Sequence, residues 1–537
     1  MSAAIQPTAR AVYDIAILGA GINGAGIARD AAMRGLRTLL FDAADIASGA
    51  SAHSTRLIHG GLRYLEHMEL SLVRESLRER ETLLRIAPHL VKPLPLLIPI
   101  YKHDKRGPRM VRAGMIAYDL LSVGKSLPRH RMLSRDETLA REPALDPAGL
   151  RGGALYYDCQ VPFAERLVLE NVVDARRHGA VVRTYHRVES ATPLVPPSTD
   201  QGQPAADCPL WSLRLRDTLT GAAASATARV LINATGAWVD LSLGTLAAAV
   251  PLLAPGRPLM GGTKGSHIVV APFEGAPETA IYAEAAGDNR PFFIIRWNGL
   301  VLIGTTDERF EGGGDPREAR AGDDEIDYLL ASVNRVLPSA GLTREQVLFT
   351  FSGVRPLPAS NDSETGAITR RHVIHEHRPE SGAPAVSPPL LSIVGRKLTT
   401  FRSLAEEVID KVGALLEREL PECATATSLL PGAPGESGAL PGDSPQFSDT
   451  TLRHLHDVYG ASASDIIRLA SDDPFFAPII DPCSGAIAAE VVYAARHEFA
   501  RTPDDVLFRR TMIGFGPDHG AEARPIVESL LAHSSSP

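Results

Sequence analysis

The sequence predicts an α/β protein with three parts: a body that opens with a βαβ unit, a β-rich middle and a helical C-terminal part. Three observations predict this fold class. Apolar runs at 13–18 and 37–41 enclose a glycine-rich turn and a helical stretch at 25–34, which is the order of a βαβ unit. Between 212 and 305, short alternating or β-branched runs prevail, and such runs are typical of strands. After residue 450 the apolar residues recur at helical spacing.

Composition places the chain among soluble globular proteins. It has 537 residues, of which 44% are hydrophobic and 22% charged, and this length allows about two to four domains. The net charge of −8 argues against a partner nucleic acid. The cysteines, Cys159, Cys208, Cys423 and Cys483, contain no C-x-x-C pair, so neither a disulfide scaffold nor a bound metal is expected.

No segment predicts export or a membrane span. The first ten residues lack the apolar core of a secretory signal. An uncharged stretch at 241–256 contains two prolines and is shorter than the ~20 residues that cross a bilayer. The chain is therefore expected in the cytoplasm, and any attachment to a membrane is expected to be peripheral.

Local patterns predict the remaining elements. Helical periodicity predicts helices over 68–87, 165–178 and 401–416. The apolar runs on either side of Asn298 and Gly299 predict a hairpin over 291–305, because this dipeptide favours a tight turn between strands. Residues 424–449 are rich in Pro, Gly and Ser and are expected to form a linker. A helical C-terminal domain is expected over 450–537, with its clearest helices at 487–500 and 504–512.

A dinucleotide site is predicted at the first strand–helix turn. Gly19, Gly21 and Gly24 match G-x-G-x-x-G. The first glycine permits the tight turn, the second lets the backbone approach a pyrophosphate, and the third lets the helix pack on the strand. Asp42 ends the second strand, where an acid accepts hydrogen bonds from a ribose hydroxyl. The expected cofactor contacts are Gly19, Gly21, Ile22, Asn23, Gly24 and Asp42, and the motif alone does not distinguish NAD from FAD.

Further motifs show a resemblance that covers nearly the whole chain. The segment 54–66 reads S-T-R-L-I-H-G-G-L-R-Y-L-E, and the chain continues with N-A-T-G-A-W at 233–238, K-G-S-H-I-V at 264–269, I-G-T-T-D at 303–307, S-G-V-R-P-L at 352–357, A-I-T-R at 367–370 and G-R-K-L-T-T at 395–400. With this combination the chain resembles the FAD-dependent (aerobic) glycerol-3-phosphate dehydrogenase family. Arg396 stands where that family usually has a second glycine.

The resemblance implies a Rossmann-like FAD-binding domain with an inserted antiparallel-sheet substrate domain, similar to D-amino acid oxidase, followed by the helical C-terminal domain. The oxidoreductase body would then cover residues 1–423. Its FAD-binding segments would lie at about 10–90, 150–240 and 350–415, and its substrate and membrane-facing segments at about 91–149 and 241–349.

The resemblance also implies FAD as the cofactor and adds contacts to it. These are Ser54, Thr55, Leu57, Gly60 and Gly61 after the second strand, Ala234 and Gly236 in a second turn, and Lys397, Leu398 and Thr399 beside the isoalloxazine.

The implied reaction oxidises sn-glycerol 3-phosphate at C2 to dihydroxyacetone phosphate, with a hydride to flavin N5 and a proton to a base. A phosphate dianion favours arginine, because the planar guanidinium offers parallel donors. The family's motifs point to Arg63, Arg355 and Arg370 for this role. His267 is the expected general base, since imidazole suits proton transfer near neutral pH. Lys397 is expected to act electrostatically on the substrate oxygen or on the reduced flavin, so the implied catalytic residues are His267, Arg355 and Lys397.

The family passes electrons to a quinone, so the resemblance implies peripheral association with the inner face of the cell membrane. Residues 92–131 support this independently: nine basic and two acidic residues give them a net charge of +7, beside apolar stretches at 94–101 and 110–123. Basic and apolar side chains together are typical of attachment to an anionic membrane surface. The alternative is a solvated basic loop over a core helix. A homodimer is left open.

Three other functions are open on the sequence alone. An oxidase of the same fold would pass the electrons to oxygen. A dehydrogenase that acts on an amino acid would need a carboxylate clamp in place of a phosphate pocket. A non-catalytic membrane-associated flavoprotein would lack the active-site groups, whereas His267, Arg355, Arg370 and Lys397 are all present.

Overall fold

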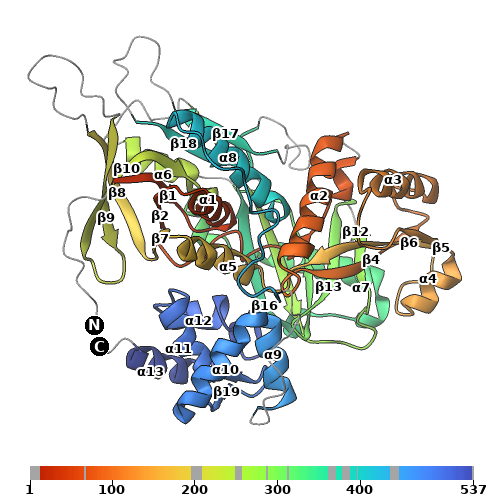
Figure 1. Ribbon diagram of the computed structural model, residues 1–537. Helices are drawn as coiled ribbons and strands as arrows, with labels where there is room; N and C mark the ends of the chain where they lie inside the picture. Colours follow the sequence, from red (N-terminus) through yellow and green to blue (C-terminus); the bar gives the residue numbers. More distant parts are fainter. Residues whose placement is uncertain are drawn as a thin grey trace, which may run out of the picture.

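The computed structural model describes residues 12–65, 68–194, 209–247, 257–285, 288–310, 314–360, 371–377, 388–395, 397–435 and 447–534, except for the side chain of Arg63. These residues form two β-sheets that stand side by side and a helical C-terminal domain that lies against both (Figure 1).

The first sheet contains the predicted βαβ unit. Five parallel strands follow the order β18–β10–β1–β2–β7, with the bounds Leu390–Val394, Ala223–Asn233, Val12–Leu18, Thr38–Phe41 and Val181–Arg183. β17 (Val373–His377) pairs antiparallel with β18, and β8 (His186–Leu194) and β9 (Leu210–Asp217) extend the sheet beside β10. Helices cover both faces of the parallel strands, and such strands read as nearly continuous apolar runs.

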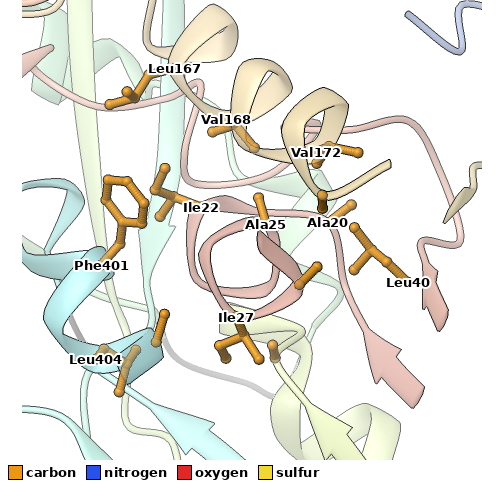
Figure 2. Close-up of a cluster of buried hydrophobic side chains, with 14 of the residues drawn as sticks. Ala20, Ile22, Ala25, Ile27, Leu40, Leu167, Val168, Val172, Phe401 and Leu404 are labelled. Carbon is orange, nitrogen blue, oxygen red and sulfur yellow. The ribbon is translucent and has the colours of Figure 1, made fainter. Parts of the chain in front are cut away.

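Helices α1 (Ile22–Met33), α5 (Ala164–Arg177) and α8 (Phe401–Leu415) pack on one face of this sheet, and α6 (Val239–Ala247) packs on the other. Figure 2 shows the core of the first face, where side chains of α5 and α8 surround the small residues of α1. Gly26 permits this close approach, since a Cβ there would lie 2.6 Å from Cδ2 of Phe401. This packing holds the N-terminal end of α1 in place beside the functional site.

The second sheet is mostly antiparallel and follows the order β15–β11–β14–β13–β12–β4–β6–β3, while β16 pairs with β11 and β5 with β6. In chain order its strands are β3 (Leu57–Ile58), β4 (Lys92–Tyr101), β5 (Arg131–Leu133), β6 (Leu150–Gln160), β11 (Thr263–Val270), β12 (Ala280–Glu284), β13 (Pro291–Trp297), β14 (Leu300–Gly304), β15 (Glu308–Arg309) and β16 (Val347–Arg355). The predicted hairpin over 291–305 is confirmed as β13 and β14. Asn298 and Gly299 at its turn have φ of 51° and 73°, the left-handed conformations that this turn needs.

Helices cover this sheet on both faces. α7 (Asp323–Val336) packs on one face, and α2 (Leu70–Ile86) and α3 (Pro108–Leu121) pack on the other. Successive side chains of β4 point to opposite faces of the sheet. Leu97 packs in the hydrophobic cluster with α7, whereas Leu96 packs in the cluster with α2 and α3. A short helix, α4 (Arg135–Arg141), lies beside β6.

The segments expected to bind FAD at about 10–90, 150–240 and 350–415 contribute strands to both sheets, since β3, β6 and β16 belong to the second one. One expectation from the sequence needs correction here. The apolar stretch 94–101 is no surface anchor, because β4 is paired with β6 on one side and with β12 on the other. Leu96, Leu97 and Ile100 are buried.

The C-terminal domain consists of α9 (Asp449–Tyr459), α10 (Ala463–Asp472), α11 (Ala488–His497), α12 (Pro503–Arg509) and α13 (Arg524–Ser534), with a small two-stranded sheet formed by β19 (Ile479–Asp481) and β20 (Ala486–Ile487). The linker predicted over 424–449 is packed in its first part: Leu430 is buried, and Arg29 of α1 donates to the carbonyl oxygens of Thr425 and Ser428. Residues 436–446 of that prediction lie outside the described residues.

Candidate active site

A cavity of about 690 Å³ lies between the two sheets. Leu18, Phe41 and Ala234, at or just after the carboxyl ends of β1, β2 and β10, line one end of it. Side chains of the second sheet, including His267 and Arg355, line the other end. Ligands of open α/β sheets bind at the carboxyl ends of the strands, and this volume is typical of cofactor pockets.

The glycine turn between β1 and α1 forms the cavity wall at the first end. Gly19 has a φ of +99°, and a Cβ there would lie 2.8 Å from the carbonyl oxygen of Ala234. A Cβ on Gly24 would lie 1.8 Å from the carbonyl oxygen of Gly19, whereas one on Gly21 would meet only Oγ of Ser51, at 3.4 Å. The open space in front of Gly21 lets a ligand approach the backbone. The N-terminal end of α1 and its positive dipole therefore border the cavity, which favours an anionic group such as a pyrophosphate.

Asp42 follows β2 and lines the same end of the cavity. Its Oδ2 accepts the N–H of Ala20 at 2.7 Å and its Oδ1 accepts the N–H of Ala44 at 2.9 Å. Burial raises the pKa of this carboxyl, and the two N–H donors oppose the shift. A carboxylate accepts about four hydrogen bonds, so lone pairs remain for the ribose hydroxyl that the sequence predicts.

One buried hydrogen-bond acceptor in this wall has no donor among the described residues. Nδ2 of Asn23 donates to the carbonyl oxygen of Gly395 at 3.4 Å, but Oδ1 is buried without a hydrogen-bond partner among the described residues. Buried polar atoms of native proteins are nearly always satisfied. The glycine cradle, the carboxylate of Asp42 and this free amide oxygen together fit a bound dinucleotide.

His267 on β11 lies at the second end of the cavity. Its Nε2 is 3.0 Å from Oγ1 of Thr55, and its ring stacks on Phe351 with centroids 4.8 Å apart. The neighbouring strand leaves room for this ring at Gly304, where a Cβ would lie 2.3 Å from Cδ2 of His267. Burial, together with the positive charge of Arg355, lowers the pKa of His267 well below its ordinary value. The imidazole is therefore neutral at pH 7 and can accept a proton.

Arg355 ends β16 close to His267. Its Nη1 donates to Oδ1 of Asp307 at 3.0 Å, and its Nη2 donates to Oγ1 of Thr305 at 2.9 Å and to the carbonyl oxygen of Thr306 at 3.0 Å. A Cβ on Gly265 would lie 2.0 Å from Nη2, so glycine is needed beside the guanidinium. The side chain is thus held in one orientation with 28% of its surface exposed. Asp307 lines the cavity and orients this arginine.

Lys397 is a further cation in the cavity wall. Its Nζ lies 3.6 Å from the ring centroid of Tyr64 and 3.4 Å from Oγ of Ser76. Leu398 and Thr399 follow in a short 3-10 helix and also line the cavity, and the Thr399 hydroxyl accepts the N–H of His59 at 3.1 Å. The departure at Arg396 lies outside the described residues.

The cavity brings together most of the residues expected from the sequence. Those that line it are Gly19, Gly21, Ile22, Asn23, Asp42, Ser54, Thr55, Leu57, Gly61, Ala234, Gly236, His267, Arg355, Lys397, Leu398 and Thr399. Gly24 packs beneath Gly19 instead. Gly60 does not line the cavity, because its N–H donates away from it to the hydroxyl of Tyr118 at 2.9 Å. The Arg63 side chain and Arg370 lie outside the described residues.

Several cavity residues were missed by the sequence analysis. His53 and His59 line the cavity. Burial lowers the pKa of each to about 4, and the positive charge of Arg56 adds to this for His53 and that of Lys397 for His59. His59 stands inside the motif at 54–66, so its sequence context was the signal. Arg290, Tyr282 and Phe293 also line the cavity. No sequence motif marks these three residues. They reach this wall through the pairing of β12 with β13, which the sequence does not reveal.

Comparisons with protein families agree with this geometry. The model of a family described as "FAD dependent oxidoreductase" matches residues 14–382. A second model, described as "C-terminal domain of alpha-glycerophosphate oxidase", matches residues 423–535.

Individual relatives cover nearly the full length. A "Glycerol-3-phosphate dehydrogenase" of Synechocystis sp. is 45% identical over 98% of this chain and 94% of its own. A "D-erythritol 1-phosphate dehydrogenase" of Brucella abortus is 36% identical over 93% of this chain and 94% of its own. The crystal structure of the glycerol-3-phosphate dehydrogenase from Bacillus halodurans, complexed with FAD, matches with a TM-score of 0.69 at 26% identity and covers 97% of this chain and 94% of that one.

Proposed function

Since the chain belongs to the family of FAD-dependent oxidoreductases that includes the glycerol-3-phosphate dehydrogenases, we propose that it oxidises sn-glycerol 3-phosphate to dihydroxyacetone phosphate. The observation that carries the proposal is the order of groups along one cavity. A dinucleotide cradle lies at one end, and a buried neutral imidazole stands beside an oriented guanidinium at the other.

The cofactor is FAD, and residues of the first sheet hold it in this proposal. The turn at Gly19 and Gly21 accommodates the pyrophosphate at the N-terminal end of α1. Asp42 accepts the ribose hydroxyl, and Oδ1 of Asn23 accepts a further donor. When bound, FAD supplies the acceptor for the hydride that leaves C2 of the substrate.

Arg355 binds the substrate phosphate in this proposal, because Asp307 and Thr305 hold its guanidinium in a fixed plane at the cavity wall. Arg63 and Arg370 are proposed for the same phosphate on the resemblance of their motifs. Lys397 adds positive charge to the wall of the same cavity. The clustering of cations favours a phosphorylated substrate over an uncharged polyol.

His267 removes the proton of the C2 hydroxyl at Nε2, the nitrogen that lies beside the cavity-lining hydroxyl of Thr55. The C2–H bond breaks with its electron pair, the C2–O bond becomes a carbonyl, and the hydroxyl proton stays on the imidazole. The low pKa keeps His267 neutral before the substrate binds, and the phosphate dianion of the bound substrate then favours the protonated imidazole. Substrate binding thus raises the basicity of His267 when the base is needed.

Anaerobic addition of sn-glycerol 3-phosphate to the purified holoprotein tests the proposal. We expect loss of the oxidised flavin absorbance with this substrate and a much slower change with glycerol, which lacks the phosphate. An absorbance that stays the same with sn-glycerol 3-phosphate would overturn the proposal and favour a non-catalytic flavoprotein.

A second substrate is favoured by one observation, the similarity to the Brucella abortus relative. D-Erythritol 1-phosphate carries the same phosphate and one more hydroxymethylene group. Comparison of kcat/KM for the two substrates distinguishes them, and we expect sn-glycerol 3-phosphate to be preferred because the more similar relative is named for it.

A membrane quinone is the proposed electron acceptor, and the proposed location is the inner face of the cell membrane. None of the helices in the described part of the chain is long and apolar enough to cross a bilayer. Turnover with a soluble quinone analogue and without peroxide release would support a dehydrogenase. Stoichiometric peroxide in air would instead indicate an oxidase.

A further inference from the structure

The segment 45–56 connects the two halves of the cavity. Ser48, Gly49, Ser51, His53, Ser54 and Thr55 all line the cavity. The hydroxyl of Ser51 accepts the N–H of Ile22 at 3.0 Å, at the start of α1. At the other end of the segment, Oγ1 of Thr55 lies 3.0 Å from Nε2 of His267. One loop therefore touches both the dinucleotide cradle and the base.

The C-terminal domain holds the first end of this segment. Arg509 and Arg510, at the end of α12, both bind the carboxylate of Asp45: Nε of Arg509 at 2.6 Å, and the two terminal nitrogens of Arg510 at 2.8 Å each. Asp45 and Arg510 are fully buried. A buried bidentate pair is geometrically specific, so these contacts fix where the loop begins.

The same domain covers the other end at Arg56. The guanidinium of Arg56 lies between two rings, 4.4 Å from the Trp297 centroid and 4.9 Å from that of Phe515, which belongs to a 3-10 helix at Ile513–Phe515. Arg56 also makes two hydrogen bonds to Glu165 at 2.7 and 2.8 Å. Its φ of 59° is in the left-handed region, which a non-glycine residue adopts only where its surroundings hold it.

A chain of ring contacts runs from the C-terminal domain to the base by a second route. Phe515 contacts Trp297 with centroids 5.1 Å apart, Trp297 contacts Phe351 at 6.3 Å, and Phe351 stacks on His267 at 4.8 Å. The C-terminal domain thus reaches His267 through Arg56 and Thr55 on one side and through Trp297 and Phe351 on the other.

We infer that the C-terminal domain completes the active site, with Phe515 and Arg509 as positioning residues that hold the 45–56 segment against FAD and set the orientation of His267. This inference rests on the proposed function for the identity of the substrate, whereas the contacts between the C-terminal domain and the 45–56 segment do not depend on it. Packing of this kind fixes a rotamer, and a small displacement of a base is costly in rate.

The test replaces Phe515→Leu in the full chain and compares it with Phe476→Leu. Phe476 is also half-buried in the C-terminal domain but contacts its core and not Trp297 or Arg56. We expect Phe515→Leu to weaken FAD binding, measured by flavin fluorescence, by about tenfold. We also expect it to move the acid limb of the anaerobic flavin-reduction rate to higher pH, because water admitted beside His267 returns the pKa toward its ordinary value. Phe476→Leu should leave both unchanged.

Equal behaviour of the two variants in FAD affinity and pH profile would overturn the inference. Arg509→Gln serves as a second variant if Phe515→Leu does not fold, since Arg510 still pairs with Asp45; FAD binding as tight as in the wild type would then overturn it. If the wild type is not reduced by sn-glycerol 3-phosphate, the proposed function fails, while the comparison of FAD affinities still decides this inference.

Discussion

The chemistry at the residue scale depends on an imidazole that the fold keeps neutral. His267 is 2% exposed, stacked on Phe351 and next to the cationic Arg355. Burial and the charge of Arg355 both disfavour a second proton on the imidazole. A dianionic substrate acts in the opposite direction, so the basicity of His267 differs between the free enzyme and the substrate complex.

We expect His267→Asn to slow anaerobic flavin reduction by roughly 10²–10⁴-fold, the usual contribution of a general base, while FAD stays bound. Rapid mixing over a pH series measures this. In the wild type, kcat/KM reports the free enzyme and kcat reports the complex. The acid limb of kcat should therefore lie at higher pH than that of kcat/KM.

His186→Asn is the matched control, because His186 lines the dinucleotide end of the same cavity. It should leave the rate of reduction near that of the wild type. An acid limb that survives unchanged in His267→Asn would assign the base to another group, with His59 the next candidate in the cavity wall.

At the scale of elements, the prediction of a membrane-facing segment at 92–131 concerns α3, which exposes both apolar and basic side chains. Met110, Leu120 and Val123 on or just after this helix are 61%, 68% and 86% exposed, and Lys105, Arg109 and Arg112 are exposed beside them. Arg106 differs from these, because it forms an ion pair with Glu284. Exposed apolar and basic side chains on one helix are typical of attachment to anionic lipid.

The triple change Lys105→Glu, Arg109→Glu and Arg112→Glu should release the protein from anionic liposomes in a sedimentation assay and leave flavin reduction intact. Each basic residue near such a surface contributes about 1 kcal/mol, so three reversals should lower binding by at least 100-fold. The control carries Arg453→Glu, Arg468→Glu and Arg496→Glu, which are exposed on the C-terminal domain. Equal loss in both triple variants would indicate a nonspecific charge effect and contradict a docking surface on α3.

Elements with a strong local signal were predictable from the sequence. The βαβ unit, α5 and the hairpin at Asn298 and Gly299 follow from apolar periodicity and turn chemistry. The membership of β6 and β16 in the second sheet was not predictable, because strand pairing depends on contacts distant in sequence. For the same reason, the sequence could not show that 94–101 is a buried strand, because an apolar run of this length is compatible with either a buried strand or a surface anchor. Motif residues such as His267 were found by resemblance, whereas Arg290 and the role of Phe515 needed the tertiary structure.

At the scale of the whole molecule, the candidate active site draws on three separate units. The first sheet provides the dinucleotide cradle, the second sheet provides His267 and Arg355, and the C-terminal domain packs behind the 45–56 segment that joins them. Filling the cavity with FAD removes water from the histidines that line it. The stability of the holoprotein therefore depends on those histidines staying neutral.

We expect the unfolding midpoint of the holoprotein to fall as the pH is lowered from 6.5 to 5. The pKa of His59 is about 4 and that of His267 lies well below 6.5 in the folded protein, so the unfolded chain binds more protons than the folded one in this window. The contribution of each such histidine to the free energy of unfolding is therefore fully present above its ordinary pKa. It is lost on acidification, by about 1.4 kcal/mol per pH unit for each histidine. Glu490 raises the pKa of His454 against the opposing effect of burial, and the stabilisation from that imidazole is gained mainly above pH 6.5, so it offsets little of this loss.

Differential scanning calorimetry of the FAD-saturated protein at several pH values measures this slope. His59→Gln should make the midpoint less dependent on pH, because glutamine keeps a polar side chain at the cavity wall but takes up no proton. His178→Gln is the control, since that imidazole is exposed at the end of α5. A midpoint that is constant between pH 6.5 and 5 in the wild type would contradict the prediction, because His59 and His267 would then be protonated without cost inside the folded protein.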